Sequence, residues 1–226
     1  MDKRRNYYIC LDTETCNTFE KDMTQAICYD IGWAICDKSG NVYKTRSFIV
    51  LETFFGMRDV MKSAYYAEKI PRYIHDINFH TREVATLMDI YYTLREDCKE
   101  YGIKAIFAHN ARFDVRALNN TIRYITKSEK RYFFPYGIPI WDTMKMAQDV
   151  IATQKTYQRF CEANAYMTSH NVPKPRVTAE ILYRYIAGQH DFIEAHTGLE
   201  DVLIEKEIFS ICMRQHRKMR RGVWGD

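Results

Sequence analysis

The first fifty residues contain three apolar segments with short connections, and this feature restricts the fold more than any other. Residues 6–12 are almost continuously apolar, which predicts a strand buried on both faces. Residues 26–36 predict a second strand, and residues 42–51 predict a third after a turn signal at 37–41. Because strands joined by short connections pair in antiparallel fashion, we expect an antiparallel meander.

The rest of the chain alternates helices with short strands. Residues 53–101 look mostly helical up to Gly102, and residues 104–108 predict a short strand. Asn110 has the side chain of a good N-cap for the helix that follows it. Further elements are a strand at 139–143, weakly patterned helix at 144–170, a proline-containing loop at 171–177, and helices at 178–187 and 198–213. This order predicts an α/β fold whose mixed central sheet, an antiparallel meander plus parallel strands, is flanked by helices.

Length and composition place the chain among single-domain globular proteins. Its 226 residues suffice for one α/β domain, and 46% hydrophobic with 27% charged residues is an ordinary balance. Charge interrupts every apolar run before it could span a membrane, and Asp12 and Glu14 interrupt the first run too early for a signal peptide. We therefore expect one domain over residues 1–226, with a basic C-terminal tail at 213–226 and no membrane partner.

The cysteines and the net charge narrow the class of protein further. Seven scattered cysteines without a C-x-x-C pair argue against a zinc ribbon. Their odd number is typical of buried free thiols in a reducing compartment, so we expect a cytoplasmic location. The formal net charge of +4 is compatible with a polyanionic partner, but many proteins that bind no nucleic acid are equally basic.

Asp12 and Glu14 stand at the end of the first predicted strand. Residues two apart in a strand point to the same face, so the two carboxylates should converge and repel each other. A divalent cation between them removes this repulsion, and Mg²⁺ or Mn²⁺ prefers oxygen ligands. The segment is equally typical of a turn that leaves the strand, and these residues alone leave the two interpretations evenly balanced.

Two more carboxylates and a histidine stand near predicted helix starts. Asp114 lies in the first turn of a helix, where an acidic side chain also simply complements the helix dipole. Asp201 lies near the start of a largely apolar helix, where a buried carboxylate needs a partner. His196 precedes that helix and could reach the same site, although a single histidine is more often a surface residue.

Taken together, these segments resemble the motifs of a known family. Asp12-Thr13-Glu14-Thr15, His109-Asn110-Ala111-Arg112-Phe113-Asp114 and His196-x4-Asp201 resemble, in this order, the three exonuclease motifs of the DEDDh family, within the proofreading-exonuclease superfamily. Residues 29–34 and 141–143 resemble two further strands of the family, so the resemblance covers about residues 6–212.

One position distinguishes this sequence from a related family, and two features differ from the DEDDh pattern. Thr197 stands where a related family has tyrosine, four residues before the last aspartate, so the sequence falls on the histidine side. The sequence departs from the family pattern at two places. Asp30 stands where relatives often have Glu, and the segment 144–177 is longer than a minimal family member needs.

The resemblance implies a ribonuclease H-like fold and a metal-dependent 3′→5′ exonuclease. It implies two divalent cations, Mg²⁺ or Mn²⁺, with Asp12, Glu14 and Asp201 on one, and Asp12 bridging to a second that Asp114 supports. His196 would take a proton from the attacking water, because an imidazole with a pKa of about 6.5 suits a general base at neutral pH. Nucleoside 5′-monophosphates would be released.

The substrate and the partners are also implied by the resemblance. Residues around the first motif hold the terminal nucleotide in relatives, and Thr13, Thr15 and Asn110 are the matching positions. We expect single-stranded 3′ ends of DNA as substrate, and a DNA polymerase or a replication or repair protein is a candidate partner. An RNA-trimming enzyme of the ribonuclease T or oligoribonuclease kind is the alternative with the same chemistry, since discrimination rests on the 2′-OH.

A different class remains open, and so does the role of the tail. A non-catalytic nucleic-acid-binding protein could have the same fold, but the intact acidic set argues against a decayed site. The basic run at 213–221 could contact phosphates outside the site or be a solvated helix end, and the sequence favours neither interpretation.

Overall fold

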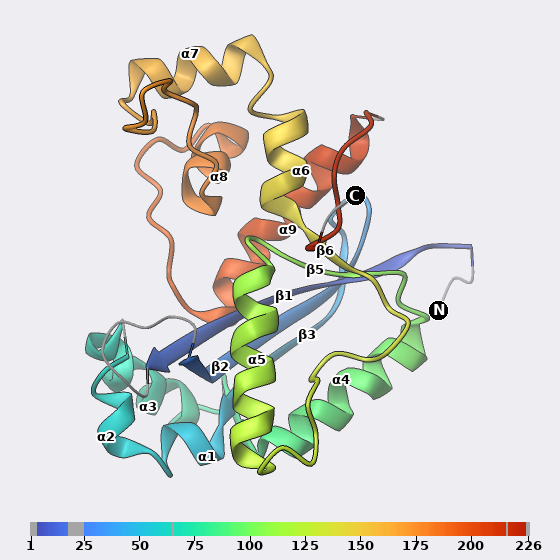
Figure 1. Cartoon of the computed structure of the whole chain (residues 1–226), viewed down its shortest axis with the longest axis vertical. Helices are drawn as coiled ribbons and strands as arrows, with labels where there is room; N and C mark the ends of the chain where they lie inside the picture. The colour runs from blue at the N-terminus through green and yellow to red at the C-terminus, as the bar shows by residue number, and fades with distance from the viewer. Residues whose placement is uncertain (1–3, 18–24, 65, 216, 225–226) are drawn as a thin grey trace.

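The computed structural model describes residues 4–17, 25–64, 66–215 and 217–224, and a six-stranded mixed sheet lies at its centre (Figure 1). The strands, in the order β4-β3-β2-β1-β5-β6, are β1 (Tyr7–Asn17), β2 (Ala26–Asp37), β3 (Val42–Val50), β4 (Glu83–Ala85), β5 (Ile106–Ala108) and β6 (Ile140–Asp142). Strands β1, β2 and β3 form an antiparallel meander, whereas β4, β5 and β6 join parallel to their neighbours. The predicted mixed sheet is therefore confirmed.

Helices cover both faces of this sheet (Figure 1). They are α1 (Leu51–Phe54), α2 (Arg58–Met61), α3 (Ile70–Asn78), α4 (Leu87–Tyr101), α5 (Arg112–Ile125), α6 (Thr143–Val150), α7 (Lys155–Ala163), α8 (Ala179–Ala187) and α9 (Gly198–Arg214), with a 3₁₀ turn η2 at Ala67–Lys69. One core lies between the sheet and α4 and α5, and a second lies between the sheet and α6 to α9. Helices α1 to α3 close a third cluster at one end of β2 and β3.

Strand β1 is buried on both faces because its side chains alternate between the two main cores. Ile9 and Leu11 belong to the core with α4 and α5, whereas Tyr8 and Cys10 belong to the core with α9. This confirms the interpretation of the apolar run as a doubly buried strand.

On the side of β1 away from β2, its neighbour β5 has only three residues, so part of this side of β1 has no partner strand among the described residues. In the described part of the chain, β5 pairs with β1 only at Ile9 and Cys10. The sequence predicted that Asp12 and Glu14 stand at the end of the first strand. In the structure β1 continues to Asn17, so both residues lie within the strand. They therefore lie on a stretch of β1 that β5 does not cover.

One local prediction is confirmed with an exception, and another is wrong. The stretch predicted as mostly helical includes strand β4, which is three residues long and too short to give a periodic pattern. Asn110 does not cap α5: the N-cap position is Ala111, and Asn110 has a left-handed backbone with φ of 63°. Its backbone N–H donates instead to the Asp142 carboxylate over 3.1 Å.

The C-terminal segment is not a solvated helix end, because α9 ends at Arg214. Beyond it, Gly222 forms an antiparallel bridge with Trp141, and the Asp142 N–H donates to the Arg221 carbonyl over 2.7 Å. The segment thus covers the edge strand β6, whose open backbone groups would otherwise invite pairing with another chain.

The cysteine prediction and the membrane prediction can be compared with the structure directly. All seven cysteines are free and buried. None of the helices in the described ranges has the length and apolarity required to cross a bilayer.

Candidate metal centre

Two glycines bring the start of α9 directly onto the sheet. A β-carbon on Gly32 would lie 2.2 Å from the backbone nitrogen of Leu199, and one on Gly198 would lie 2.7 Å from the backbone nitrogen of Gly32. Any larger residue would therefore push the helix away. Because Gly32 is the register partner of Asp12, this contact brings the first turn of α9, which carries Asp201, close to Asp12.

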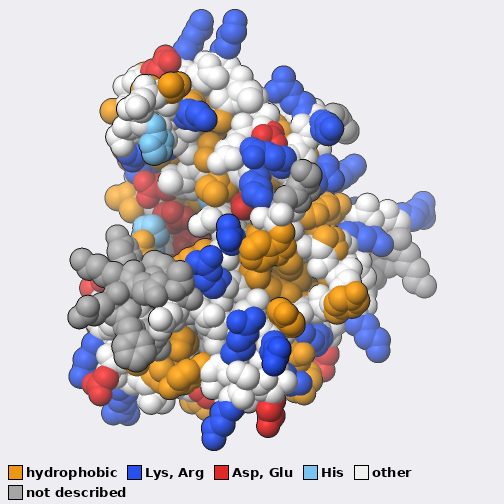
Figure 2. Space-filling model, in the orientation of Figure 1, with side chains coloured by type: hydrophobic (Ala, Val, Ile, Leu, Met, Phe, Trp, Pro, Cys, Tyr) orange, Lys and Arg blue, Asp and Glu red, His pale blue; other side chains and the backbone are white. Residues whose placement is uncertain are grey.

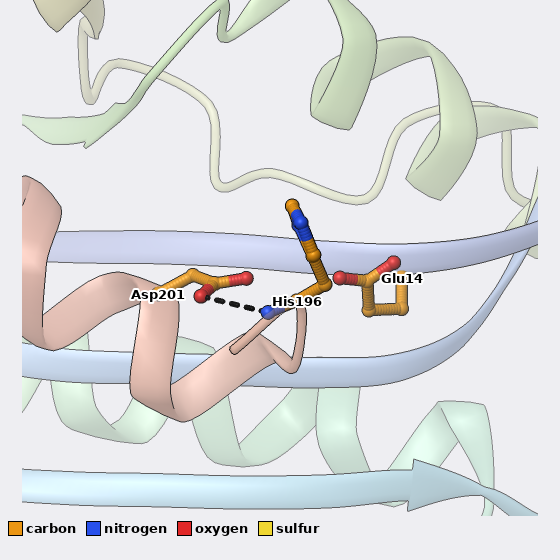
Figure 3. Close-up of side chains that lie close together, drawn as sticks. All are labelled: Glu14, His196 and Asp201. Carbon is orange, nitrogen blue, oxygen red and sulfur yellow. Dashed lines mark hydrogen bonds between the residues drawn. The ribbon is translucent and has the colours of Figure 1, made fainter. Parts of the chain in front are cut away.

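Segments far apart in the sequence contribute carboxylates to the open edge of β1. Asp12 is influenced electrostatically by carboxylates from β1 itself, from the start of α5 and from α9. Asp12 and three of these neighbours are the carboxylates predicted from the sequence, and we call them the metal-centre carboxylates: Asp12, Glu14, Asp114 and Asp201. In Figure 3, the carboxylates of Glu14 and Asp201 face each other on either side of His196, and the potential ligand atoms of the three residues all lie within 4.8 Å of each other.

Burial and mutual repulsion raise the proton affinity of these groups. Burial, followed by the charge of Asp201, raises the pKa of Glu14 to about 9, and Lys69 offsets this only in part. Burial, followed by the charge of Glu194, raises the pKa of Asp201 to about 8. The pKa of Asp12 lies well above its usual range for the same reason, burial first. Among the described residues, no Lys or Arg forms an ion pair with a metal-centre carboxylate.

Asp114 is held in place from the opposite face of β1. Its carboxylate is buried and accepts a hydrogen bond of 2.8 Å from the Thr13 hydroxyl. Burial raises the pKa of Asp114 to about 7, although the Thr13 hydroxyl opposes this shift. Because the Thr13 side chain is buried and occupied in this way, a substrate contact at Thr13 would have to come from its backbone. Thr15 is also buried, whereas Asn110 is exposed.

A fifth carboxylate, which was not predicted from the sequence, lies beside the four metal-centre carboxylates. Glu205 lies one helical turn after Asp201 on the same side of α9 and is only 3% exposed. Its carboxylate accepts a hydrogen bond of 3.3 Å from the backbone N–H of His109. Burial, followed by the charge of Asp114, raises the pKa of Glu205 well above its usual range. The four-residue spacing from Asp201 was the available signal.

His196 lies beside the metal-centre carboxylates in a strained backbone conformation. Its φ of 49° is left-handed, which is uncommon for a residue other than glycine and is concentrated at functional sites. The backbone N–H groups of His196 and Thr197 both donate to the Asp201 carboxylate, over 3.2 and 2.9 Å. The imidazole stacks on Tyr66, with ring centroids 4.4 Å apart. Burial, followed by the charge of Lys69, lowers the pKa of His196, which favours the neutral ring at pH 7.

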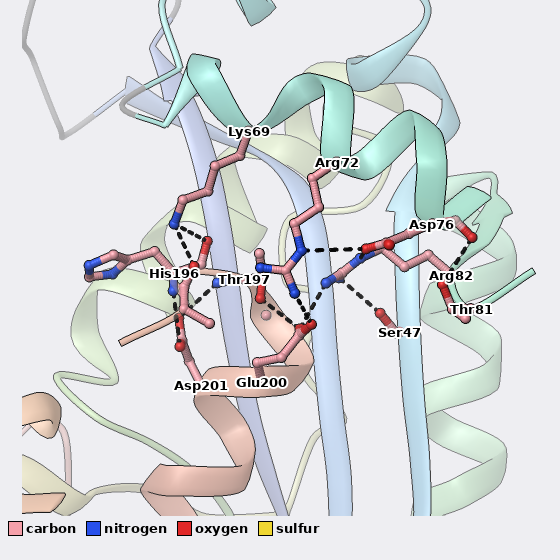
Figure 4. Close-up of polar contacts among 12 residues, drawn as sticks. Ser47, Lys69, Arg72, Asp76, Thr81, Arg82, His196, Thr197, Glu200 and Asp201 are labelled. Carbon is pink, nitrogen blue, oxygen red and sulfur yellow. Dashed lines mark hydrogen bonds and ion pairs between the residues drawn. The ribbon is translucent and has the colours of Figure 1, made fainter. Parts of the chain in front are cut away.

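Asp30, where the sequence departs from the family pattern, belongs to a separate group of residues that includes the ion pair between Arg82 and Glu200 (Figure 4). We call Asp30, Tyr73, Arg82 and Glu200 the anchor cluster. Buried Asp30 pairs with Arg82 over 3.1 Å, and Arg82 also pairs with Glu200 over 2.8 Å. Asp30 additionally accepts from the Gly198 N–H over 3.0 Å, so the anchor cluster fixes the first residue of α9.

The donor set of the metal centre fits hard divalent cations. It consists of carboxylate oxygens with one imidazole beside them, and oxygen ligands of this type suit Mg²⁺ and Mn²⁺. The carboxylates converge without a protein cation to neutralise them, and buried charge of this kind requires either protons or a metal.

Sequence comparison matches no family model and no curated protein. Comparison with solved structures, in contrast, finds the same fold over nearly the whole chain. The nuclease domain of 3′hExo, a DEDDh family member bound to rAMP, matches with a TM-score of 0.59 at 11% identity, over 98% of both chains. E. coli exonuclease I in complex with a dA16 oligonucleotide matches with a TM-score of 0.55 at 12% identity, over 94% of this chain and 42% of the other. The cell-death related nuclease 4 (CRN-4) matches with a TM-score of 0.54 at 10% identity, over 96% and 67%. The chain therefore has the ribonuclease H-like fold of these exonucleases.

Proposed function

We propose that this chain is a metal-dependent 3′→5′ exonuclease that forms one domain over residues 1–226 and acts in the cytoplasm. One observation supports the proposal above all: β1, α5 and α9 bring Asp12, Glu14, Asp114 and Asp201 together, and no Lys or Arg among the described residues forms an ion pair with them. The fold of solved exonucleases adds to this support.

The metal-centre carboxylates would hold two divalent cations, Mg²⁺ or Mn²⁺. When bound, these cations polarise the scissile phosphodiester and lower the pKa of the attacking water. His196 accepts a proton from that water at a ring nitrogen, because its lowered pKa keeps the imidazole neutral at pH 7. The water oxygen forms a new bond to phosphorus, the bond between phosphorus and the 3′ oxygen breaks, and that oxygen takes up a proton from solvent. The product is a nucleoside 5′-monophosphate.

We infer single-stranded DNA as the substrate, held at its terminal nucleotide by Thr13, Thr15 and Asn110. E. coli exonuclease I, which was solved with dA16, supports DNA, whereas the rAMP in the 3′hExo structure supports an RNA-trimming alternative. A replication or repair protein is the partner that a DNA substrate would imply.

The test is a hydrolysis assay with three substrates: 5′-labelled single-stranded DNA, duplex DNA and RNA, each with Mg²⁺, Mn²⁺ or excess EDTA. We expect shortening of the single-stranded DNA from its 3′ end with either metal, release of 5′-monophosphates, and none of these in EDTA. Full hydrolysis in excess EDTA, or binding without hydrolysis in both metals, would contradict the proposed function. Faster shortening of the RNA would select the alternative.

A further inference from the structure

Helix α5 carries a stripe of arginines on its outer side, of which Arg112 and Arg123 are exposed and Arg116 is half-buried. Arg112, Arg116 and Arg123 are four and seven residues apart, which places them on one side of the helix, opposite to the buried side with Asp114 and Leu118. We call these three residues the arginine stripe. Figure 2 shows Lys and Arg side chains over the face that α5 occupies in Figure 1.

The first two arginines of the stripe have no anionic partner among the described residues. Arg112 and Arg116 form no hydrogen bond or ion pair there, although Asp114 lies between them in the sequence. Arg112 is the first residue of α5, where the helix dipole disfavours positive charge, and Arg116 lies one turn later. The position of Arg112 is therefore unfavourable for the stability of the isolated protein, and an external anion would remove the disadvantage.

Exposed aromatic rings lie beside both ends of the stripe. The Arg112 guanidinium lies 5.3 Å from the ring centroid of Trp224, which is 70% exposed. The Arg123 guanidinium lies 5.8 Å from the ring centroid of Tyr132, which is 67% exposed. Lys145 donates to the carbonyl of Val223 over 2.8 Å and so holds the segment that carries Trp224.

We propose that the arginine stripe, Trp224 and Tyr132 form the track on which a single-stranded nucleic acid lies next to its 3′-terminal nucleotide. The inference rests on the proposed function, because the stripe begins in the helical turn that brings Asp114 to the metal centre. Guanidinium groups bind phosphates, and flat rings stack on bases of any sequence. Stacking requires unpaired bases, so the track favours a single strand over a duplex.

Binding and hydrolysis are tested separately. The probe is a 5′-fluorescein-labelled dT16, and its fluorescence anisotropy is measured without divalent cations at several NaCl concentrations. We expect the double variant Arg112→Ala with Arg116→Ala to bind on the order of tenfold more weakly at low salt. The slope of log affinity against log salt should fall by about 1 per arginine. Trp224→Ala should weaken binding by a similar factor and leave the slope unchanged, because stacking releases no counterions.

Lys38→Ala is the matched control. This exposed residue lies in the β2–β3 turn, just after the C-terminal end of β2, and its loss removes one positive charge, whereas the double variant removes two. We expect its affinity and slope to equal those of the wild type. Thermal unfolding of each variant confirms that the fold is kept. Equal binding by the double variant and the control would overturn the track. Arginine dependence without an effect of Trp224→Ala would mean a general polyanion surface and would also overturn it.

Hydrolysis distinguishes the two proposals. The ratio of kcat/KM on dT16 to kcat/KM on the dinucleotide dT2 should fall about tenfold in the double variant, because dT2 is too short to reach along the stripe. An unchanged ratio in an active enzyme would contradict the track and leave the exonuclease intact. Arginine-dependent and Trp224-dependent binding by a wild type that hydrolyses neither substrate would contradict the proposed function and leave the track standing.

Discussion

The start of α9 lies between two groups of carboxylates that differ in whether a protein cation neutralises them. In the anchor cluster, Asp30 is fully buried, but Arg82 pairs with it, and Tyr73 donates a hydrogen bond of 2.9 Å to it. Among the metal-centre carboxylates Asp114 and Asp201 are buried and Asp12 and Glu14 are half-buried, but within the described residues no Lys or Arg forms an ion pair with them. Arg82 neutralises Asp30 within the chain, whereas the metal-centre carboxylates require protons or a metal ion.

This difference is the one expected if the anchor cluster is structural and the metal-centre carboxylates have the proposed function. A buried anion is costly unless it is paired, so the anchor cluster can exist only because its partner is built in. It holds Gly198 against β2 and so places Asp201 next to Asp12. The metal centre depends on this scaffold, while its own charge balance depends on something outside the chain.

The largest effect is expected at Asp12, which no hydrogen bond from a described side chain holds. Asp12→Asn should lower kcat/KM by more than about 10⁴-fold, because it disturbs both proposed cations, whereas loss of a base alone costs at most about that much. The metal-free variant should be at least as stable as the wild type, because a carboxyl group whose ionised form is disfavoured by burial and by its neighbours is replaced by a neutral amide. Near-normal hydrolysis, or a large loss of metal-free stability, would place Asp12 with the anchor cluster instead.

A smaller effect is expected at the proposed base. His196→Ala should lower kcat by about 10²- to 10⁴-fold and leave metal affinity nearly intact. The residual rate should rise with pH as hydroxide replaces the missing base. Near wild-type turnover at pH 7 with an unchanged pH profile would show that His196 takes no part in the reaction.

The anchor cluster should respond in stability. Arg82→Met leaves Asp30 buried without its partner, and the free energy of unfolding should fall by about 3–5 kcal/mol. Arg72→Met is the matched control: Arg72 also pairs with Glu200, over 2.7 Å, but it is exposed, so its loss should cost less than about 1 kcal/mol. Urea unfolding measures both. Equal losses would remove the distinction between a neutralised buried cluster and a surface pair.

The two groups also differ in how far the sequence could predict them. The shared face of Asp12 and Glu14 was predictable, because residues two apart in a strand point to the same side, whereas their role as metal ligands was implied only by the family resemblance. The pairing of Asp30 with Arg82 was not, because 52 residues separate them and no local pattern connects them. Glu205 was overlooked because an acidic residue within a helix looks like an ordinary solvent-facing position until the packing of both faces is known.

A similar physical reason explains which elements were predicted. The apolar strands β1 and β2 and the patterned helix α5 follow from their own residues. Strand β4 and the backbone of Asn110 are set by contacts with the rest of the chain: β4 pairs with β3, and Asn110 donates to Asp142. Local propensity contains no information on such contacts.

The pH dependence of stability should also separate the groups. The folded-state pKa values of about 7 for Asp114, about 8 for Asp201 and about 9 for Glu14 lie above the ordinary range. The folded state therefore binds more protons than the unfolded state from about pH 4 to pH 9, and metal-free stability should decrease as pH rises through this window. Urea unfolding at constant ionic strength should show higher stability at about pH 5 than at about pH 8.5, with a shallower decrease in Asp12→Asn. A rise in stability over this window would contradict the assigned shifts.

The measurement that tests the central claim most directly is the thermal unfolding of the wild type and Asp12→Asn during a titration with Mn²⁺ at pH 7.5. A cation that binds only the folded state stabilises it by about 2.7 kcal/mol at a concentration 100 times its Kd. The metal centre predicts a saturable rise in Tm for the wild type, little or no rise for Asp12→Asn, and an undiminished rise for Arg72→Met. An equal response of the wild type and Asp12→Asn, or no response in either, would contradict the claim that these carboxylates are gathered to hold divalent cations.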